Sequence, residues 1–229
     1  ATQNIWGRTP LWPLRKRALA RALHEADIVL LQEVHARGTR SQAHELADRM
    51  GLPHAHFVSV GRTLWWREGV AVISRWPIIH TASQKLPQSR LNPVDRFAPR
   101  AVFRAVIQSP AGNLEIYVLH LSLSRSARIR ASRSIPDFVT QQRRIVPADF
   151  SVIGGDFNAS HHEPCVLKLQ THCGVQDVHR GGDATFPAYW PHRRIDYLLA
   201  SPNLRIRNVE RRASCGSDHC GLIAHVDCN

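Results

Sequence analysis

Two apolar spacings run along the chain, and together they predict both helices and strands. Apolar residues recur at helical spacing over 14–23 and 43–50, and the second stripe ends at Gly51, a residue typical of a helix C-terminus. Two more helices are expected at 136–146 and near 163–170. Strands are expected in much of the remaining chain.

Short β-rich segments separated by Gly, Pro or Asn predict those strands. The expected strands are 2–6, 28–31, 56–60, 69–74, 101–108, 114–120, 150–153, 195–200, 204–209 and 222–226. Residues 84–99 hold three prolines and no periodicity, so a loop is expected there, and the Arg-rich segment 122–134 is expected to be a linker. Helices mixed with antiparallel strands favour an α/β sandwich.

A length of 229 residues favours one domain, which we expect to span 1–229 as a monomer. No apolar run approaches the roughly 18 residues needed to cross a bilayer. The chain starts at Ala1 inside the first expected strand, which allows for a truncated strand and an absent leader. A soluble domain is expected, and cytoplasmic and secreted localisation both stay open.

The net charge is +12 and the sequence pI is about 10.7, which favours a polyanionic partner such as nucleic acid or an anionic membrane surface. Arginine dominates the basic residues and binds phosphate in a bidentate manner, although a base-composition bias gives the same skew. The charge supports an acidic substrate without identifying it.

The five cysteines form no CxxC pair, so a zinc cluster is not expected. Cys165 could bridge to Cys173, and Cys215 could bridge to Cys220 or Cys228. The odd number leaves at least one thiol free or intermolecular, so the redox compartment stays open.

Asp156 and Asn158 follow the strand predicted at 150–153, which we expect Gly154-Gly155 to end. Side chains at i and i+2 of an extended backbone point to the same side. A carboxylate beside a carboxamide suits a hard divalent cation and a phosphate oxygen. The alternative is an ordinary Asx turn after the strand.

Polar residues recur at strand ends throughout the chain, and each also has a purely structural interpretation. They are Asn4, Glu33, His120, Asp156, Asn158, Asp196, Asp218 and His219. Glu33 could cap the following helix, Asp196 could pair with Arg193 or Arg194, and His120 could be a hydrogen-bonded core histidine. Their significance therefore depends on the whole set.

As an ordered set, the motifs resemble the signature of the endonuclease/exonuclease/phosphatase superfamily over nearly the whole chain. The matching motifs are Gln3-Asn4-Ile5, Leu31-Gln32-Glu33-Val34, Gly69-Val-Ala-Val-Ile-Ser74, His120-Leu121, Gly155-Asp156-Phe157-Asn158, Arg194-Ile195-Asp196-Tyr197 and Ser217-Asp218-His219. The resemblance implies the fold of deoxyribonuclease I, a four-layered α/β sandwich of two packed mixed β-sheets flanked by helices.

The resemblance also implies a Mg²⁺ (or Mn²⁺) site. Glu33 would be the principal ligand with Asn4 beside it, and Asp218 would help to hold this ion or a second one. A zinc site is a weak alternative, because His161-His162 lacks the i, i+4 spacing that two ligands on one helix need.

The resemblance assigns catalytic roles as well. Asp156 would orient or deprotonate the attacking water, and Asn158 and His120 would bind phosphate oxygens. His219, oriented by Asp196, would stabilise the transition state or act as the base. Phosphoryl hydrolysis mainly requires such positioning and charge neutralisation.

Substrate contacts are expected from two segments. Arg125, Arg128 and Arg130 follow His120 and could bind phosphates, although a solvated basic face is a close alternative. Tyr189 and Trp190 precede Asp196 in a loop where this superfamily often contacts its substrate.

Two comparisons with branches of the superfamily restrict the range of possible substrates. His120, and the lack of an acidic residue directly after Asn4, disfavour the AP endonucleases. No insert resembles the membrane-penetrating hairpin of the sphingomyelinases. Trp65-Trp66 is the one candidate exposed aromatic pair, and we expect it to pack in the core.

The sequence thus predicts a Mg²⁺-dependent phosphodiesterase, a nuclease acting on DNA or RNA with little sequence preference. The first alternative is a phosphatase or phospholipase-C-like hydrolase of an inositol phosphate, sphingomyelin or another anionic phospholipid. A catalytically inactive binding module is a third alternative, which the complete set of polar residues disfavours.

Overall fold

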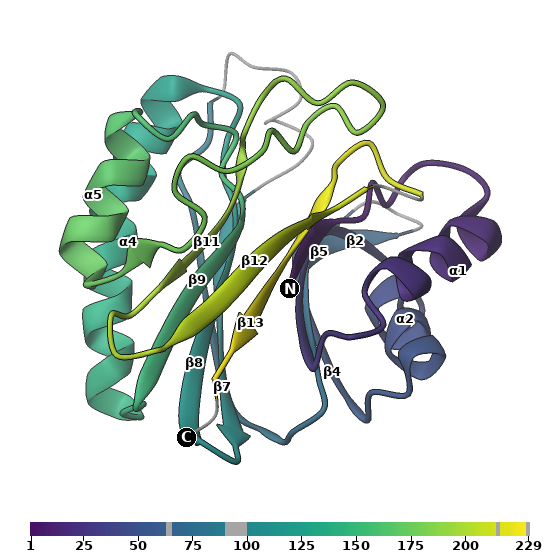
Figure 1. The fold of residues 1–229 in the computed structure, drawn as a ribbon, viewed down its shortest axis with the longest axis horizontal. Helices are drawn as coiled ribbons and strands as arrows, with labels where there is room; N and C mark the ends of the chain where they lie inside the picture. The colour runs from purple at the N-terminus through teal and green to yellow at the C-terminus, as the bar shows by residue number, and fades with distance from the viewer. Residues whose placement is uncertain (63–65, 90–99, 214–215, 228–229) are drawn as a thin grey trace.

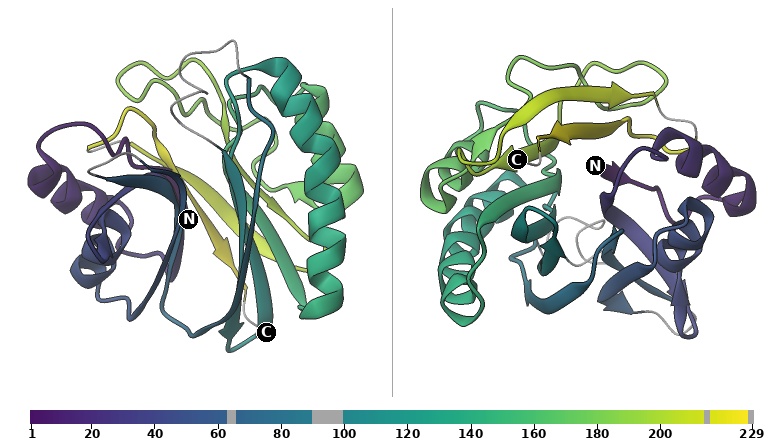
Figure 2. Two further views of the ribbon diagram at one scale, coloured as in Figure 1. Left: turned by 180° about the vertical axis from the view of Figure 1, so that it is seen from behind. Right: turned by 60° about the horizontal axis from the view of Figure 1, so that its bottom comes forward.

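The structure, a computed structural model, describes residues 1–62, 66–89, 100–213 and 216–227. Two β-sheets stack face to face in these residues, and helices cover the outer face of each sheet (Figure 1). The order of layers is helices, sheet, sheet, helices, which both views of Figure 2 also show. The expected four-layered α/β sandwich is confirmed.

The first sheet runs in the order β12-β13-β1-β2-β5-β4, and β3 pairs with the end of β2. Its strands are β1 (Thr2–Asn4), β2 (Ile28–Arg37), β3 (Arg40–Ser41), β4 (His54–Arg62), β5 (Arg67–Ser74), β12 (Ile206–Arg212) and β13 (Gly221–Val226). Helices α1 (Trp12–Ala22) and α2 (Gln42–Met50) cover its outer face, where Leu19 and Leu46 pack with Leu31.

The second sheet runs in the order β10-β11-β9-β8-β7-β6. Its strands are β6 (Ile78–Lys85), β7 (Ala101–Ser109), β8 (Gly112–His120), β9 (Phe150–Asp156), β10 (Gln176–Asp177) and β11 (Asp196–Ala200). Helices α4 (Arg125–Ile145) and α5 (Pro164–Cys173) cover its outer face, where Phe138 and Val166 pack with Tyr117.

A third apolar cluster lies between the two sheets and fixes their relative position. Leu30 and Val72 of the first sheet pack there with Phe103 and Val118 of the second. These side chains are at most 2% exposed. Burial of apolar surface contributes roughly 25 cal/mol per Å², so this layer resists any sliding of one sheet over the other.

Strand direction gathers the polar strand ends at one edge of the sandwich. β1 and β2 are parallel, with Asn4 beside Gln32, and β8 and β9 are parallel, with His120 beside Asp156. β11 is antiparallel to β9 and begins at Asp196, which lies opposite Asp156. Residues far apart in the chain therefore meet at one edge.

The Arg-rich segment expected to be a linker is helical, so that prediction was wrong. Helix α4 begins at Arg125 and continues past Pro136 to Ile145. Ala127, Ala131, Ile135, Phe138 and Val139 form its buried stripe. The stripe packs on the second sheet, and this tertiary packing outweighs the helix-breaking tendency of the internal proline.

Several strand boundaries also differ from expectation. β9 does not end at Gly154-Gly155 but runs to Asp156. Gly155 (φ +140°) lies within the strand because it has no side chain: a Cβ there would lie 1.9 Å from the carbonyl oxygen of Leu119. β2 continues beyond residue 31 to Arg37. β6 was not predicted and covers the start of the loop expected at 84–99; residues 90–99 lie outside the described residues.

The cysteine and tryptophan expectations also change. Cys165, Cys173 and Cys220 are free and buried, so the first disulfide considered does not form. Cys215 and Cys228, like Trp65, lie outside the described residues. The side chain of Trp66 is 48% exposed, so core packing was the wrong expectation for it. Among the described helices, none is both long and apolar enough to cross a membrane.

Candidate active site

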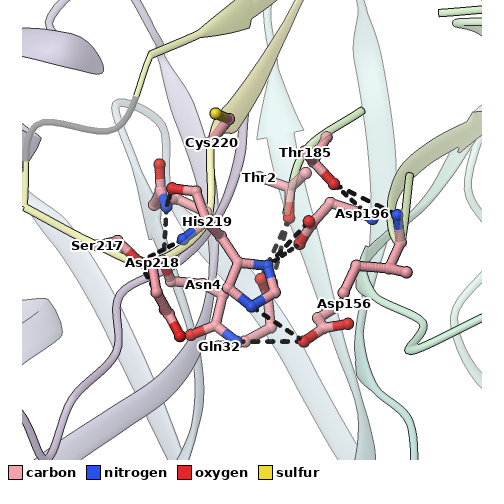
Figure 3. Close-up of polar contacts among 12 residues, drawn as sticks. Thr2, Asn4, Gln32, Asp156, Thr185, Asp196, Ser217, Asp218, His219 and Cys220 are labelled. Atoms are coloured by element: carbon pink, nitrogen blue, oxygen red, sulfur yellow. Dashed lines mark hydrogen bonds and ion pairs between the residues drawn. The ribbon is translucent and has the colours of Figure 1, made fainter. Parts of the chain in front are cut away.

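Asn4 joins the two sheets at the polar edge of the sandwich. It is the last residue of β1, and its Nδ2 donates to Oε1 of Glu33 at 3.1 Å. The same Nδ2 donates to Oδ2 of Asp156 at 3.2 Å (Figure 3). Glu33 has a φ of +56° and lies where the register of β2 with β5 shifts, between Leu31 and Val34. This irregularity turns the Glu33 carboxylate toward the second sheet.

His219 and Asp196 form a buried pair on the other side of Asp156. Nδ1 of His219 lies 2.9 Å from Oδ2 of Asp196, and Nε2 lies 3.7 Å from Oδ2 of Asp156. Thr185 Oγ1 accepts a hydrogen bond from the backbone N–H of Asp196, and the Phe186 ring packs 4.7 Å from the His219 ring. Asp196 thus orients His219 (Figure 3).

The alternative partners considered for Asp196 are engaged elsewhere. Arg194 forms an ion pair with Asp177 at 2.6 Å and stacks on the ring of Tyr197. The Arg193 guanidinium lies over the ring of Phe186. In the described part of the chain, Asp196 has no arginine as ion-pair partner.

The charges of this side of the site balance one another. Burial raises the pKa of Asp156 to about 7. Burial opposes the charge on His219, but Asp196 and Asp156 outweigh that effect and raise the pKa of the imidazole to about 10. The three residues offer ligand atoms within 4.8 Å of one another, a spacing that would also fit a metal ion. The contact of His219 with Asp196 and the raised pKa of Asp156 suit these residues to proton handling.

Glu33 and Asp218 place two partly buried carboxyl groups on the other side of the site, near the positive charges of Arg15 and His219. Burial raises the pKa of both carboxyl groups, and Asp218 further raises the pKa of Glu33. Among the described residues, no lysine or arginine forms an ion pair with either one. Two desolvated carboxylates beside the carboxamide of Asn4 form an oxygen-rich donor set that fits a hard divalent cation. The residues predicted to bind Mg²⁺ or Mn²⁺ therefore fit such an ion.

His120 stands at the end of β8 between the two carboxylates of the central cluster. Its Nε2 lies 3.5 Å from Oδ2 of Asp156 and 4.0 Å from Oε1 of Glu33. Burial, and then the charges of Arg100 and His219, lower the pKa of His120 well below its usual value. The imidazole is therefore neutral and can serve as a hydrogen-bond donor.

The backbone conformation that places Asn158 in the site differs from the one expected. Its φ of +49° is left-handed rather than extended. Its backbone N–H donates to Oδ1 of Asp156 at 2.9 Å, and its Nδ2 donates to the carbonyl of Leu121 at 3.0 Å. The Asx turn considered as a structural alternative does form, and it holds the carboxamide beside Asp156.

Arg100 is a site residue that the sequence reasoning missed. It is 4% exposed, and its Nη1 lies 2.7 Å from Nδ1 and 2.6 Å from Nε2 of His120. A signal for it exists in the predicted strands. Residues 101–108 and 114–120 are consecutive strands that pair antiparallel, so the residue before the first lies beside the end of the second.

Two polar side chains tie the segment around His219 to β1. Gln3 Nε2 donates to the carbonyl of His219 at 3.1 Å, and Ser217 Oγ donates to the carbonyl of Asn4 at 2.6 Å. Arg15 of α1 donates to the carbonyl of Gly216 at 2.8 Å. Gln3 and Ser217 belong to the recognised motifs, whereas nothing in the sequence singles out Arg15.

The three arginines predicted to bind substrate differ in their surroundings. Arg128 is 6% exposed, pairs with Glu163 at 2.7 Å and donates to the carbonyls of Ser122 and Leu123. This places its guanidinium in a structural role. Arg125 is exposed at the start of α4, and Arg130, also exposed, donates to the carbonyl of Gln88 at 3.2 Å.

Tyr189 and Trp190 lie on an exposed turn close to the site. Their side chains are 88% and 74% exposed. The backbone N–H of Ala188 donates to the carbonyl of Asp218 at 2.7 Å, which fixes the turn against the segment that carries His219. The turn that carries the two aromatic residues therefore lies beside the segment that carries Asp218 and His219.

The chain matches the endonuclease/exonuclease/phosphatase family over residues 1–219. It therefore belongs to this family, whose members are phosphoric ester hydrolases and generally depend on a divalent metal. No match is found among curated proteins.

Solved structures share the fold at low sequence identity. A family protein from Leptotrichia buccalis is 17% identical, with 99% of this chain and 98% of that chain covered and a TM-score of 0.76. The mannosyl-6-phosphatase of Bacteroides thetaiotaomicron is 16% identical, with 99% of this chain and 98% of that chain covered and a TM-score of 0.75. The beta toxin of Staphylococcus aureus is 18% identical, with 99% of this chain and 98% of that chain covered and a TM-score of 0.71. At these identities the likeness concerns the fold alone.

Proposed function

We propose that the protein is a Mg²⁺- or Mn²⁺-dependent phosphodiesterase that hydrolyses DNA or RNA. One observation carries this proposal. Asn4 contacts both Glu33 and Asp156, so the acidic side with Glu33 and Asp218 and the His219–Asp196 pair meet within one cluster. Such an arrangement supplies both a cation site and a proton acceptor for the hydrolysis of a phosphate ester.

Glu33, Asn4 and Asp218 would hold the divalent cation, which would supply Lewis acidity and neutralise phosphate charge. Asp156 orients the attacking water and accepts its proton. The water oxygen forms a bond to phosphorus, the bond between phosphorus and the leaving oxygen breaks, and that oxygen departs with the bonding electrons. It takes up a proton from solvent water, and Asp156 returns the proton it accepted to solvent. The raised pKa of Asp156 is consistent with a base that works near neutral pH.

His219 stabilises the transition state. Because Asp196 accepts the hydrogen bond from Nδ1, Nε2 points toward Asp156 and the reacting phosphate. The imidazolium donates from Nε2 to an oxygen that gains negative charge as the bond breaks. His219 is therefore assigned as an electrostatic stabiliser and Asp156 as the base.

Arg100, His120 and Asn158 bind the non-bridging phosphate oxygens. Arg100 places a permanent cation beside the neutral imidazole of His120. Asn158 lies next to Asp156 in the Asx turn. A guanidinium suits this task because its donors match the geometry of a phosphate.

Two features support nucleic acid as the substrate. The net charge of +12 attracts a polyanion over long range. Tyr189 and Trp190, on the turn beside the segment that carries His219, offer exposed rings on which bases could stack. A phosphate monoester, an inositol phosphate or a phospholipid are the other outcomes of the test below.

The test is a hydrolysis screen with plasmid DNA, RNA, bis-p-nitrophenyl phosphate, p-nitrophenyl phosphate, sphingomyelin vesicles and inositol phosphates, with Mg²⁺, Mn²⁺ or EDTA. Asp156→Ala and His219→Ala are the test variants, and Arg205→Ala, an exposed residue far from the site, is the control. We expect metal-dependent cleavage of nucleic acids that both test variants lose. Cleavage that persists in EDTA, or turnover of monoesters alone, would refute the proposal.

A further inference from the structure

A groove of about 530 Å³ adjoins the active site and has no part in the steps above. It lies between the turn at 160–163 before α5, the loop residues 181–184 and the segment 192–195. We call it the Arg193 groove. Ser160 follows Asn158 by two residues and Ile195 directly precedes Asp196, so two walls of the groove continue into the catalytic cluster.

A stack of three side chains connects the groove to the catalytic imidazole. The Arg193 guanidinium carbon lies 5.9 Å from the centre of the Phe186 ring. The Phe186 ring lies 4.7 Å from the ring of His219. One aromatic ring, that of Phe186, therefore separates Arg193 from His219.

The positive charge of the groove belongs to Arg193. Glu163 is the acidic residue in the described lining, and Arg128 pairs with it at 2.7 Å. Arg194 is compensated by Asp177 at 2.6 Å. No described carboxylate forms an ion pair with Arg193. This arginine is exposed at the groove, has no acidic partner among the described residues, and lies over the face of Phe186.

We propose that the Arg193 groove binds a second phosphate of the substrate, the phosphodiester adjacent to the one that is cleaved. This inference rests on the proposed function and narrows it. An arginine held against an aromatic ring keeps its N–H groups directed outward for a phosphate. The enzyme then prefers a substrate with at least two phosphates in series, as in an oligonucleotide, over an isolated diester or a sugar monophosphate.

Two pairs of small substrates isolate this effect. Each pair is a thymidine p-nitrophenyl phosphodiester with and without one extra phosphate, the ester being on the 5′ oxygen in one pair and on the 3′ oxygen in the other. We expect the extra phosphate to raise kcat/KM about tenfold in one pair, mainly through KM, as for one charge-assisted hydrogen bond. Arg193→Gln should reduce this ratio to about one, and Arg193→Lys should keep part of it.

Arg180→Gln is the matched control, because Arg180 is exposed in the same loop but does not line the groove. It should leave the ratio unchanged. Turnover of both members of each pair at equal kcat/KM, or a preference that Arg193→Gln retains, would overturn this inference alone. Absence of turnover for all four compounds would overturn the proposed function, and this inference with it.

Discussion

The two ends of the β-sandwich are built from the same strands, but one end gathers carboxyl groups and the other encloses an apolar cavity. At the catalytic end, burial raises the pKa of the carboxyl groups of Glu33, Asp156 and Asp218. At the opposite end, an apolar cavity of about 280 Å³ lies between the sheets, where Leu30 and Ile116 form part of its lining. Both ends lower the free energy of unfolding. The catalytic end does so because charged groups are desolvated there, and the opposite end because its packing is incomplete.

This difference separates the residues that stabilise the fold from the residues proposed to act in catalysis. The inter-sheet cluster stabilises the sandwich without touching the reacting groups. The catalytic end gathers carboxylates that the folded state does not favour, and the rigid sheets hold them together. Substitutions at the two ends should therefore separate activity from stability.

The largest expected effect is on activity, from Glu33→Gln. The variant should lose at least about 10³-fold in kcat/KM, roughly 4 kcal/mol, because the principal metal ligand is removed. Its Tm without metal should be equal to or higher than that of the wild type, because a partly buried carboxylate is replaced by a neutral amide that can still accept from Asn4.

Differential scanning fluorimetry with and without Mg²⁺ measures this separation. The wild type should gain Tm with the ion, and the variant should lose that gain. Glu25→Gln, at an exposed position remote from the site, is the control. A Glu33→Gln protein that still responds to Mg²⁺, or that is markedly less stable without it, would contradict the assignment of Glu33.

The next effect is on stability, from Ile116→Ala in the layer between the sheets. Ile116 is 2% exposed and borders the cavity, so truncation enlarges an existing void. We expect a loss of about 2–4 kcal/mol in the free energy of unfolding and a change of less than about twofold in kcat. Urea denaturation and a steady-state assay test both parts, and a large drop in kcat would show that the two ends are coupled.

A smaller effect is expected from Arg100→Gln. Loss of the guanidinium beside His120 should lower kcat/KM about 10²-fold, roughly 2.7 kcal/mol, and Arg100→Lys should restore part of it. Arg205→Gln at the other end of the molecule should have wild-type kinetics. If Arg100→Gln alters the Tm but leaves the kinetics unchanged, Arg100 has a structural role only.

The smallest effect concerns the cavity itself. Ala200 is 4% exposed and lines the cavity, so Ala200→Val would place two methyl groups in it. We expect a gain of at most about 1 kcal/mol in the free energy of unfolding with unchanged kinetics. A loss of more than about 1 kcal/mol would show that the space beside Ala200 cannot accept them.

The predicted strand ends explain how much of the site was readable from the sequence. Asn4, His120, Asp156 and Asp196 each stand at the end or start of a strand in a recognised motif. Arg100 directly follows residues 90–99, which lie outside the described part of the chain, and it matches no motif, so it escaped notice. Arg128 was assigned to the substrate because composition shows its charge but does not show that Glu163 pairs with it.

The sequence by itself determined the apolar periodicity of most elements, the family motifs and the residue types that suit a cation and a phosphate, because these depend on neighbours along the chain. Only the tertiary structure decided that α4 continues through Pro136, that β9 passes through Gly155, and that Asn4 bridges two sheets. Each of these depends on contacts between segments distant in sequence, whose packing energy overrides local preference.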